Sequence, residues 1–148
     1  MTDLTADPAF QIYAASVVVL GFNLLAIANN TALSRVFTDT VVNPEDTKLN
    51  AKADVVGYAG EELTQRYQRM HRNALENIPL FLITGLVLCL VGVSPTVAGV
   101  LFGIFTVARV SHSVCYRFGI QPFRTASFGI GAIAQAVILG FIAYGTFF

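Results

Sequence analysis

The sequence predicts an all-α integral membrane protein, a bundle of four membrane-spanning helices, and three observations carry this prediction. Hydrophobic residues make up 55% of the 148 residues, charged residues only 12%, and the mean hydropathy is +0.65. The apolar residues fall into four long runs, each able to cross the roughly 30 Å hydrocarbon core of a bilayer. Polar residues gather at one end of these runs. The length fits one domain, residues 1–148.

We expect the helices to cover about residues 10–36, 61–92, 95–118 and 122–147. The first apolar run, Ile12 to Leu33, follows an acidic segment without a basic residue, which favours a retained helix over a cleaved signal peptide. Asn23, Asn29 and Asn30 interrupt this run, and their amides should face protein, where they can find partners. Arg35 ends the helix and, taken alone, is typical of an interfacial anchor.

Residues 38–61 form a polar connection that is too long for a simple hairpin between two helices. Within it, Asn43 followed by Pro44, Glu45 and Asp46 predicts a short helix, with Asn as the cap, Pro in the first position and acids in the first turn. The stretch from Val55 to Gly60 is interpreted as a flexible approach to the second long helix.

The second helix joins a charged half to an apolar half. At 100° per residue, five polar side chains share an arc of roughly 120°, whereas His71 lies outside it: Arg66, Arg69, Arg72, Asn73 and Glu76. Such an arc cannot face lipid. Pro79 removes one helical hydrogen bond and should bend the helix where its apolar half begins.

The third and fourth helices each carry one polar face. Ser94 caps the third helix and Pro95 starts it. Near its end, four side chains share an arc: Arg109, His112, Ser113 and Tyr116. Five residues line one face of the fourth helix: Arg124, Ser127, Phe128, Gly131 and Gln135. Cys89 and Cys115 lie within apolar runs and are interpreted as small buried residues rather than as a disulfide.

The distribution of basic residues predicts the orientation. All nine Lys and Arg residues lie between Arg35 and Arg124, and they flank the first and third connections but not the second. By the positive-inside rule, those two connections are cytoplasmic and both termini are outside. The net charge is zero, which argues against nucleic acid as a partner, and we expect no metal site.

The three polar faces lie at the cytoplasmic ends of their helices, so they can converge on one site. Arginine binds carboxylates in a bidentate manner, and a single carboxylate such as Glu76 suits an ammonium group. A small, net-negative ligand with several carboxylates and one amine matches this set. Alternatively, Glu76 pairs with Arg109 and only joins the helices.

These residues resemble the MAPEG family, membrane-associated proteins in eicosanoid and glutathione metabolism, in its glutathione transferase and prostaglandin E synthase branch. The resemblance extends from Arg35 to about Gln135. It rests on the following segments: Arg35, Asn43-Pro44-Glu45-Asp46, Arg66-x-x-Arg69-x-His71-Arg72-Asn73-x-x-Glu76-x-x-Pro79, Ala108 to Tyr116, and Arg124.

The resemblance implies a homotrimer with glutathione as cosubstrate, bound between subunits near the cytoplasmic face. It implies these glutathione contacts: Arg69, Arg72, Asn73, Glu76, His112, Tyr116 and, from an adjacent subunit, Arg35. It also implies three catalytic residues: Arg124, which would stabilise the glutathione thiolate, Thr125, whose hydroxyl stands where the synthase has serine, and Asp46.

We therefore expect a glutathione transferase, with peroxidase activity as an extension, that acts on lipophilic small molecules delivered by membrane lipid. Two alternatives stay open. One is a glutathione-dependent isomerase of a lipid endoperoxide. The other is a non-enzymatic lipid-binding protein of the same fold, which would not need the convergent arginines.

Overall fold

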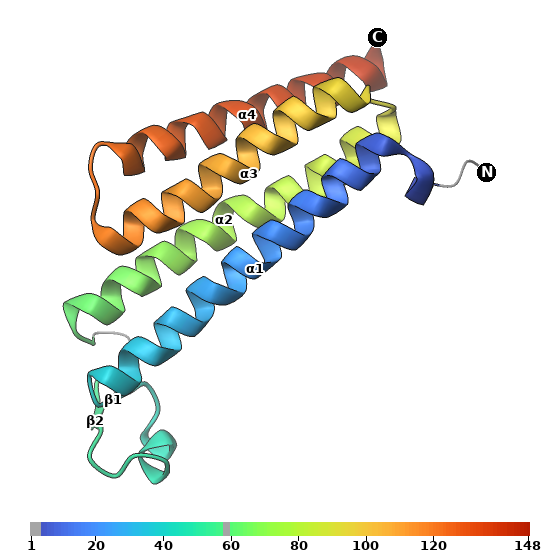
Figure 1. Ribbon diagram of the computed structural model, residues 1–148. Coiled ribbons are helices and arrows are strands. Elements are labelled where there is room, and N and C mark those ends of the chain that lie inside the picture. The colour runs from blue at the N-terminus through green and yellow to red at the C-terminus, as the bar shows by residue number, and fades with distance from the viewer. Residues whose placement is uncertain (1–3, 58–59) are drawn as a thin grey trace.

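The computed structural model contains four long helices that lie side by side (Figure 1). They are α1 (Pro8–Phe37), α2 (Glu62–Val91), α3 (Pro95–Phe118) and α4 (Phe123–Phe147). The structure describes residues 4–57 and 60–148. The predicted four-helix architecture is confirmed, and every helix begins and ends within two residues of its expected position.

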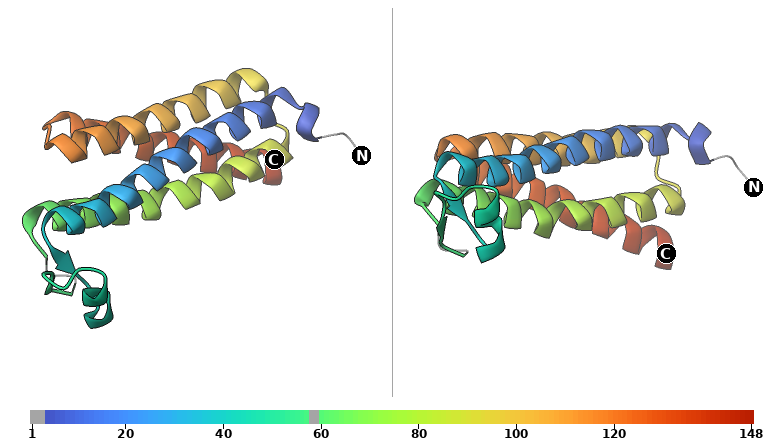
Figure 2. Two further views of the ribbon diagram at one scale, coloured as in Figure 1. Left: turned by 60° about the horizontal axis from the view of Figure 1, so that its bottom comes forward. Right: turned by 90° about the horizontal axis from the view of Figure 1, so that it is seen from below.

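The helices form an up-and-down bundle. α3 packs most extensively against α4, and α1 packs against both α2 and α3. Among the described residues α1 and α4 do not touch, so they lie on opposite sides of the bundle (Figure 2). Both termini and the α2–α3 turn lie at one end, and the other two connections lie at the opposite end (Figure 1).

The helix ends follow from local sequence. Ser94 accepts a hydrogen bond from the backbone N–H of Val97 at 3.4 Å, which confirms its role as the cap of α3. Asp7 caps α1 in the same way, through the N–H of Ala9 at 2.8 Å. Gly92, with φ of 94°, ends α2 in the left-handed conformation that glycine adopts without steric cost.

An aromatic cluster fills the end of the core nearer the termini. Phe81 and Phe105 stack with ring centroids 4.3 Å apart, and Phe102 meets Phe81 edge-on at 5.5 Å. Tyr13 joins them from α1, and its hydroxyl donates to the Leu82 carbonyl at 2.7 Å. A Cβ on Gly85 would lie 2.9 Å from the Tyr13 ring, so this close approach of α1 and α2 requires glycine.

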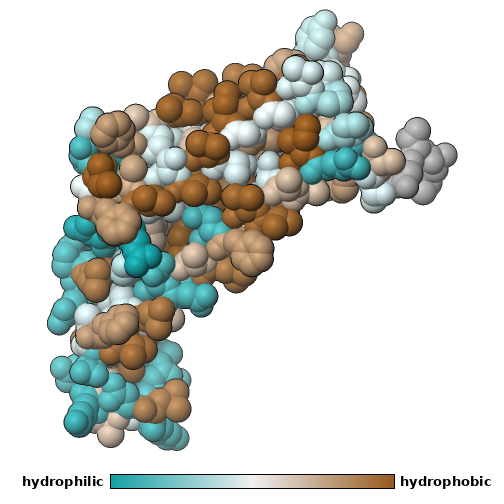
Figure 3. Space-filling model, in the orientation of Figure 1, coloured by the Kyte–Doolittle hydropathy of each residue, from teal (hydrophilic) through white to brown (hydrophobic). Residues whose placement is uncertain are grey.

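All four helices are long and apolar enough to cross a membrane. Large apolar side chains cover their outer surface, and hydrophilic residues gather around the α1–α2 connection (Figure 3). Lipid tails are as apolar as these side chains, so in a bilayer the hydrophobic effect does not favour burying them inside the bundle. An apolar outer belt is therefore the surface expected of a protein surrounded by lipid. The chain is therefore an integral, multi-pass membrane protein.

The α1–α2 connection is more structured than the sequence indicated. The predicted short helix is confirmed as η2, a 3-10 helix (Pro44–Lys48), although the Asn43 side chain donates to Asp46 rather than capping the backbone. The interpretation of Val55 to Gly60 as flexible is wrong at its start. Val55 belongs to β2 (Asp54–Val55), which pairs in parallel with β1 (Thr40–Val41). Residues 58 and 59 lie outside the described part.

The expectation that the α1 asparagines face protein is confirmed at Asn23, whose amide donates to the Ser113 hydroxyl at 3.1 Å and joins α1 to α3. Within the single subunit it does not extend to the other two asparagines. Asn29 is exposed, and the Asn30 amide returns to a carbonyl of its own helix. α2 continues through Pro79 without a break in the helix, and the bend expected at this residue stays a prediction.

Candidate functional site

A buried arginine marks the centre of the polar end of the bundle. Arg109 of α3 is 2% exposed, and its guanidinium lies over the rings of Phe105 and Phe128, at 5.3 and 5.2 Å. Its Nη1 lies 3.5 Å from the amide oxygen of Asn73 on α2. Desolvating a guanidinium is costly, and ring faces offset part of this cost. Arg109 therefore joins three helices around one charge.

Gly131 of α4 makes room for this guanidinium. A Cβ at this position would lie 3.0 Å from both Nε and Nη2 of Arg109. Those two nitrogens are buried and have no hydrogen-bond partner among the described residues. The polar face predicted for α4 is thus confirmed at Gly131 and Phe128, which meet the cation of α3.

The first turn of α4 is attached to α3 through Arg124. His112 donates from Nδ1 to the Arg124 carbonyl oxygen at 2.9 Å, since a carbonyl can only accept. The Arg124 guanidinium lies over the Tyr116 ring at 4.7 Å. Thr125 donates its hydroxyl to the Gln121 side chain at 3.1 Å. Both the backbone and the cation of Arg124 are therefore positioned by α3.

Arg69 connects α2 to this region. It forms a salt bridge with Glu62 at 2.8 Å, in which the two side chains are 48% and 70% exposed. Its guanidinium also interacts with the Tyr116 side chain. We call the following residues the polar cluster: Arg69, Asn73, Arg109, His112, Tyr116 and Arg124. Sequence reasoning did not single out Glu62, since a glutamate in the first turn of a helix is common.

A groove of about 490 Å³ lies between α1 and α2 on the neighbouring face of α2. Arg35, Arg72 and Glu76 line it, together with His71, which the helical arc had left out. His71 reaches this groove because α1 packs beside α2. A sequence pattern that follows one helix at a time could not place it there.

The predicted site residues thus fall into two groups at one end of the bundle. Five belong to the polar cluster: Arg69, Asn73, His112, Tyr116 and Arg124. Three line the α1–α2 groove: Arg35, Arg72 and Glu76. The alternative pairing of Glu76 with Arg109 does not occur, because Glu76 is exposed and Arg109 contacts Asn73.

The remaining predicted residues lie at the margins. Asp46 shares a cleft of about 580 Å³ with Arg35, formed by the end of α1 and the α1–α2 connection. Thr125 is exposed at the start of α4. Among the described residues, no group of three His, Cys, Asp or Glu side chains is placed to hold a metal ion.

The polar surface of α2 joins the two groups. At 100° per residue, Asn73, Arg69, Glu76 and Arg72 follow one another around the helix, from the α3 side to the α1 side. Arg69, Arg72 and Glu76 are exposed in the single subunit. A small molecule with several charged groups can contact all four side chains at once.

The fold and this polar end define a multi-pass membrane protein with an arginine-rich group of polar side chains at one end of its helices. The chain belongs to the MAPEG family, whose sequence profile matches residues 12–144. It is 31% identical to human microsomal glutathione S-transferase 1 over 137 residues, 88% of each chain. The mouse protein of that name is 33% identical over 129 residues, 83% of this chain and 79% of its own. Horse prostaglandin E synthase is 31% identical over 132 residues, 88% of this chain and 83% of its own.

Proposed function

We propose that this protein is a membrane-bound glutathione transferase, which joins the glutathione thiolate to lipophilic electrophiles. One observation carries the proposal: arginines from three helices lie at the same end of the bundle as the exposed carboxylate of Glu76. Arg35 and Arg72 line one groove with Glu76, whereas Arg69 and Arg124 belong to the neighbouring polar cluster. Glutathione carries two carboxylates, one ammonium group and a thiol, so its charges match this set. The relatives named for glutathione transfer support the same assignment.

Different side chains on the polar surface of α2 bind different groups of glutathione. Arg69 and Arg72 bind the two carboxylates, since guanidinium groups form paired hydrogen bonds with them. Glu76 binds the ammonium group, and Asn73 supplies amide hydrogen bonds to the peptide backbone. His112 and Tyr116 line the α3 side, next to the Arg124 cation.

Activation of the thiol falls to Arg124. A free thiol has a pKa near 8.5, and about 1.4 kcal/mol of preference for the thiolate lowers it by one unit. A guanidinium beside the sulfur in a partly desolvated site supplies roughly one to three units. Because the Tyr116 ring and the His112 contact hold Arg124, the cation is in place before the ligand arrives. Thr125 adds one hydroxyl hydrogen bond.

We further propose a homotrimer in which the α1–α2 groove of one copy faces the polar cluster of the next. Arg69, Arg72 and Glu76 are exposed on a membrane-spanning helix, and charged side chains in that position require a polar or protein neighbour. The shared site would bring Arg35 of one copy to glutathione held by another. The mass of the particle in detergent, corrected for bound detergent, separates a trimer from a monomer.

In the proposed orientation, both termini lie outside and the ligand site faces the cytoplasm. The distribution of Lys and Arg supports this orientation. These residues lie toward the end of the bundle with the α1–α2 and α3–α4 connections, and the other end carries none. A membrane-impermeant thiol reagent on intact cells should therefore label Asp3→Cys and not Lys52→Cys. Labelling of Lys52→Cys from outside, with the parent chain unlabelled, would reverse the orientation.

A second candidate is the isomerisation of a lipid endoperoxide. The relatives named prostaglandin E synthase favour it. Asp46, a catalytic residue by the family resemblance, lines one cleft with Arg35 at the end of α1. The two activities are separated by product analysis with purified protein in lipid nanodiscs. We expect conjugation of a chloronitrobenzene to glutathione, and reduction of lipid hydroperoxides as an extension. Endoperoxide isomerisation without conjugation would favour the second candidate, and loss in Asp46→Asn would assign its acid.

A further inference from the structure

The turn between α3 and α4 exposes apolar side chains next to an arginine. Phe118, Ile120 and Phe123 are 66%, 41% and 65% exposed. The Arg117 guanidinium lies over the Phe118 ring, at 5.6 Å from its centroid. The turn lies at the same end of the bundle as the α1–α2 connection (Figure 1). In a bilayer it is therefore placed where the hydrocarbon meets the headgroups.

Arg66 of α2 reaches this turn from the neighbouring helix. A Cβ on Gly119, which ends α3, would lie 2.8 Å from Nη1 of Arg66, so the guanidinium rests against the backbone of the turn. The C-terminus of a helix carries partial negative charge and favours a cation in this position. Arg66 and Arg117 therefore bring two positive charges to the end of α3.

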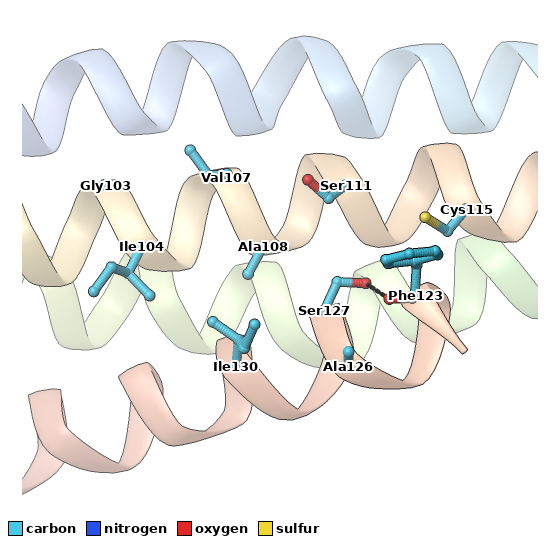
Figure 4. A pocket seen from close by; sticks show the side chains of 10 residues that line it. All are labelled: Gly103, Ile104, Val107, Ala108, Ser111, Cys115, Phe123, Ala126, Ser127 and Ile130. Carbon is cyan, nitrogen blue, oxygen red and sulfur yellow. Dashed lines mark hydrogen bonds between the residues drawn. The ribbon is translucent and has the colours of Figure 1, made fainter. Parts of the chain in front are cut away.

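Phe123 completes the apolar part of this region on the α4 side. Its ring points toward α3, beside Cys115 (Figure 4). Its carbonyl oxygen accepts the Ser127 hydroxyl at 2.7 Å, so the start of α4 meets this backbone group within its own helix. We call the following residues the turn surface: Arg66, Arg117, Phe118, Ile120 and Phe123.

The turn surface carries positive charge that no ion pair offsets in the described part of the chain. Within residues 4–57 and 60–148, neither Arg66 nor Arg117 forms a salt bridge. The sequence holds no Asp or Glu after Glu76. The α1–α2 connection differs, because residues 38–61 hold five acids and two lysines, a net charge of −3. A negatively charged partner is thus attracted to the turn surface and repelled by the connection.

We propose that the turn surface binds an anionic phospholipid, with its phosphate on the two arginines and its acyl chains against the three apolar side chains. Guanidinium groups form paired hydrogen bonds with phosphate oxygens. Two arginines without an acid favour a lipid whose phosphate is not balanced by an ammonium group such as that of choline. The exposed apolar side chains favour a lipid over free phosphate, which has no apolar part. The inference goes beyond glutathione transfer and does not depend on it.

Lipid retention tests this preference. Each protein is reconstituted into vesicles of equal parts phosphatidylcholine and phosphatidylglycerol and extracted in a mild detergent, and the retained lipid is identified by native mass spectrometry. Arg66→Gln/Arg117→Gln removes two charges from the turn surface. Lys48→Gln/Lys52→Gln is the matched control, because it removes two charges from the α1–α2 connection. Both lipids are present on both faces of the vesicle, so the orientation of the protein does not enter the comparison.

We expect the parent to retain phosphatidylglycerol at least about fivefold over phosphatidylcholine, and Arg66→Gln/Arg117→Gln to bring this ratio below about twofold. Lys48→Gln/Lys52→Gln should keep the ratio of the parent. A parent without preference, or equal losses in both double variants, would overturn the proposal. Loss of the oligomer in Arg66→Gln/Arg117→Gln with an unchanged lipid ratio would assign the turn surface to contact between copies and would overturn it as well.

A single tryptophan gives a second readout with both arginines in place. The chain contains no tryptophan, so Ile120→Trp on the turn surface and Leu25→Trp midway along α1 each introduce one. Leu25 is also exposed. Lipids with brominated acyl chains quench the fluorescence of a tryptophan that they contact. Brominated phosphatidylglycerol should quench Ile120→Trp at least about twofold more than brominated phosphatidylcholine, and the two lipids should quench Leu25→Trp equally.

Glycerol phosphate in the buffer separates a lipid from a soluble phosphate. It should leave the quenching of Ile120→Trp unchanged, because it lacks acyl chains. Relief of the quenching by glycerol phosphate would assign the site to soluble phosphates and overturn the lipid assignment. Equal quenching of Ile120→Trp by the two brominated lipids would contradict any preference for the anionic headgroup.

Discussion

Arg124→Leu is expected to lower turnover with a chloronitrobenzene at least about tenfold at neutral pH, while glutathione affinity stays within a few fold. The guanidinium lies over the Tyr116 ring, and the carboxylates of glutathione are assigned to Arg69 and Arg72 on α2. Removing the Arg124 guanidinium therefore leaves the proposed carboxylate contacts intact and takes the positive charge away from the sulfur. The pKa of the bound thiol rises, so less thiolate is present at pH 7.

The pH dependence separates this loss from general damage. The thiolate is the reactive form, so raising the pKa of the bound thiol lowers activity at pH values below that pKa. Activity returns as the pH rises through the pKa, because the thiol then ionises. Turnover of Arg124→Leu should approach that of the parent above about pH 9.5, and the ultraviolet absorbance of the bound thiolate should follow the same curve. Thr125→Ala should show a smaller shift, because its hydroxyl contributes one neutral hydrogen bond.

Arg117→Leu is the matched control for the Arg124 substitution. Arg117 is an exposed arginine at the same end of the bundle, beside the Phe118 ring, so its loss tests the effect of positive charge on membrane orientation. It should keep the thiolate absorbance and turnover of the parent. If Arg124→Leu also kept both, Arg124 would have no part in the mechanism.

Arg69→Ala and Glu76→Ala are each expected to weaken glutathione by about 1.5–3 kcal/mol, roughly 10- to 150-fold in Kd, as for a lost hydrogen bond to a charged group. The two variants should differ in which part of the ligand they affect. A glutathione analogue without the ammonium group should bind the parent and Glu76→Ala equally, whereas Arg69→Ala should still weaken it. Equilibrium binding in detergent measures both.

The salt bridge of Arg69 with Glu62 supplies the control for the Arg69 variant. If Arg69 served only that exposed pair, which is worth about 0–1 kcal/mol, Glu62→Ala would reproduce the effect of Arg69→Ala. We expect Glu62→Ala to bind glutathione within about threefold of the parent. Matching losses in Glu62→Ala and Arg69→Ala would return Arg69 to a structural role.

Much of the architecture was predictable because membrane helices carry strong local signals. Apolar runs and end signals such as Ser94-Pro95 determine where each helix lies, and Pro44 with its acidic neighbours predicts η2. The β1–β2 pair was not predictable. Each strand has two residues, too few for an alternating pattern, and the ladder joins Thr40 to Asp54 across a long connection.

The sequence predicts which residues lie at the polar end of the bundle better than it predicts which of them contact one another. Helical spacing placed Arg109, His112 and Tyr116 on one face, and these side chains do lie together. Spacing alone could not show that Arg109 would contact Asn73 rather than Glu76, because that choice depends on how α3 rotates against α2. The place of His71 depends on α1 in the same way.

Glutathione binding tests the central claim most directly. The purified protein in detergent is titrated with glutathione and, in parallel, with its amide analogue in which both carboxylates are blocked. We expect saturable binding of glutathione that weakens with added salt, since the contacts are between charges, and at least tenfold weaker binding of the blocked analogue. Equal affinity for the two peptides, or no binding by a folded protein, would contradict the assignment of this arginine-rich end as a glutathione site.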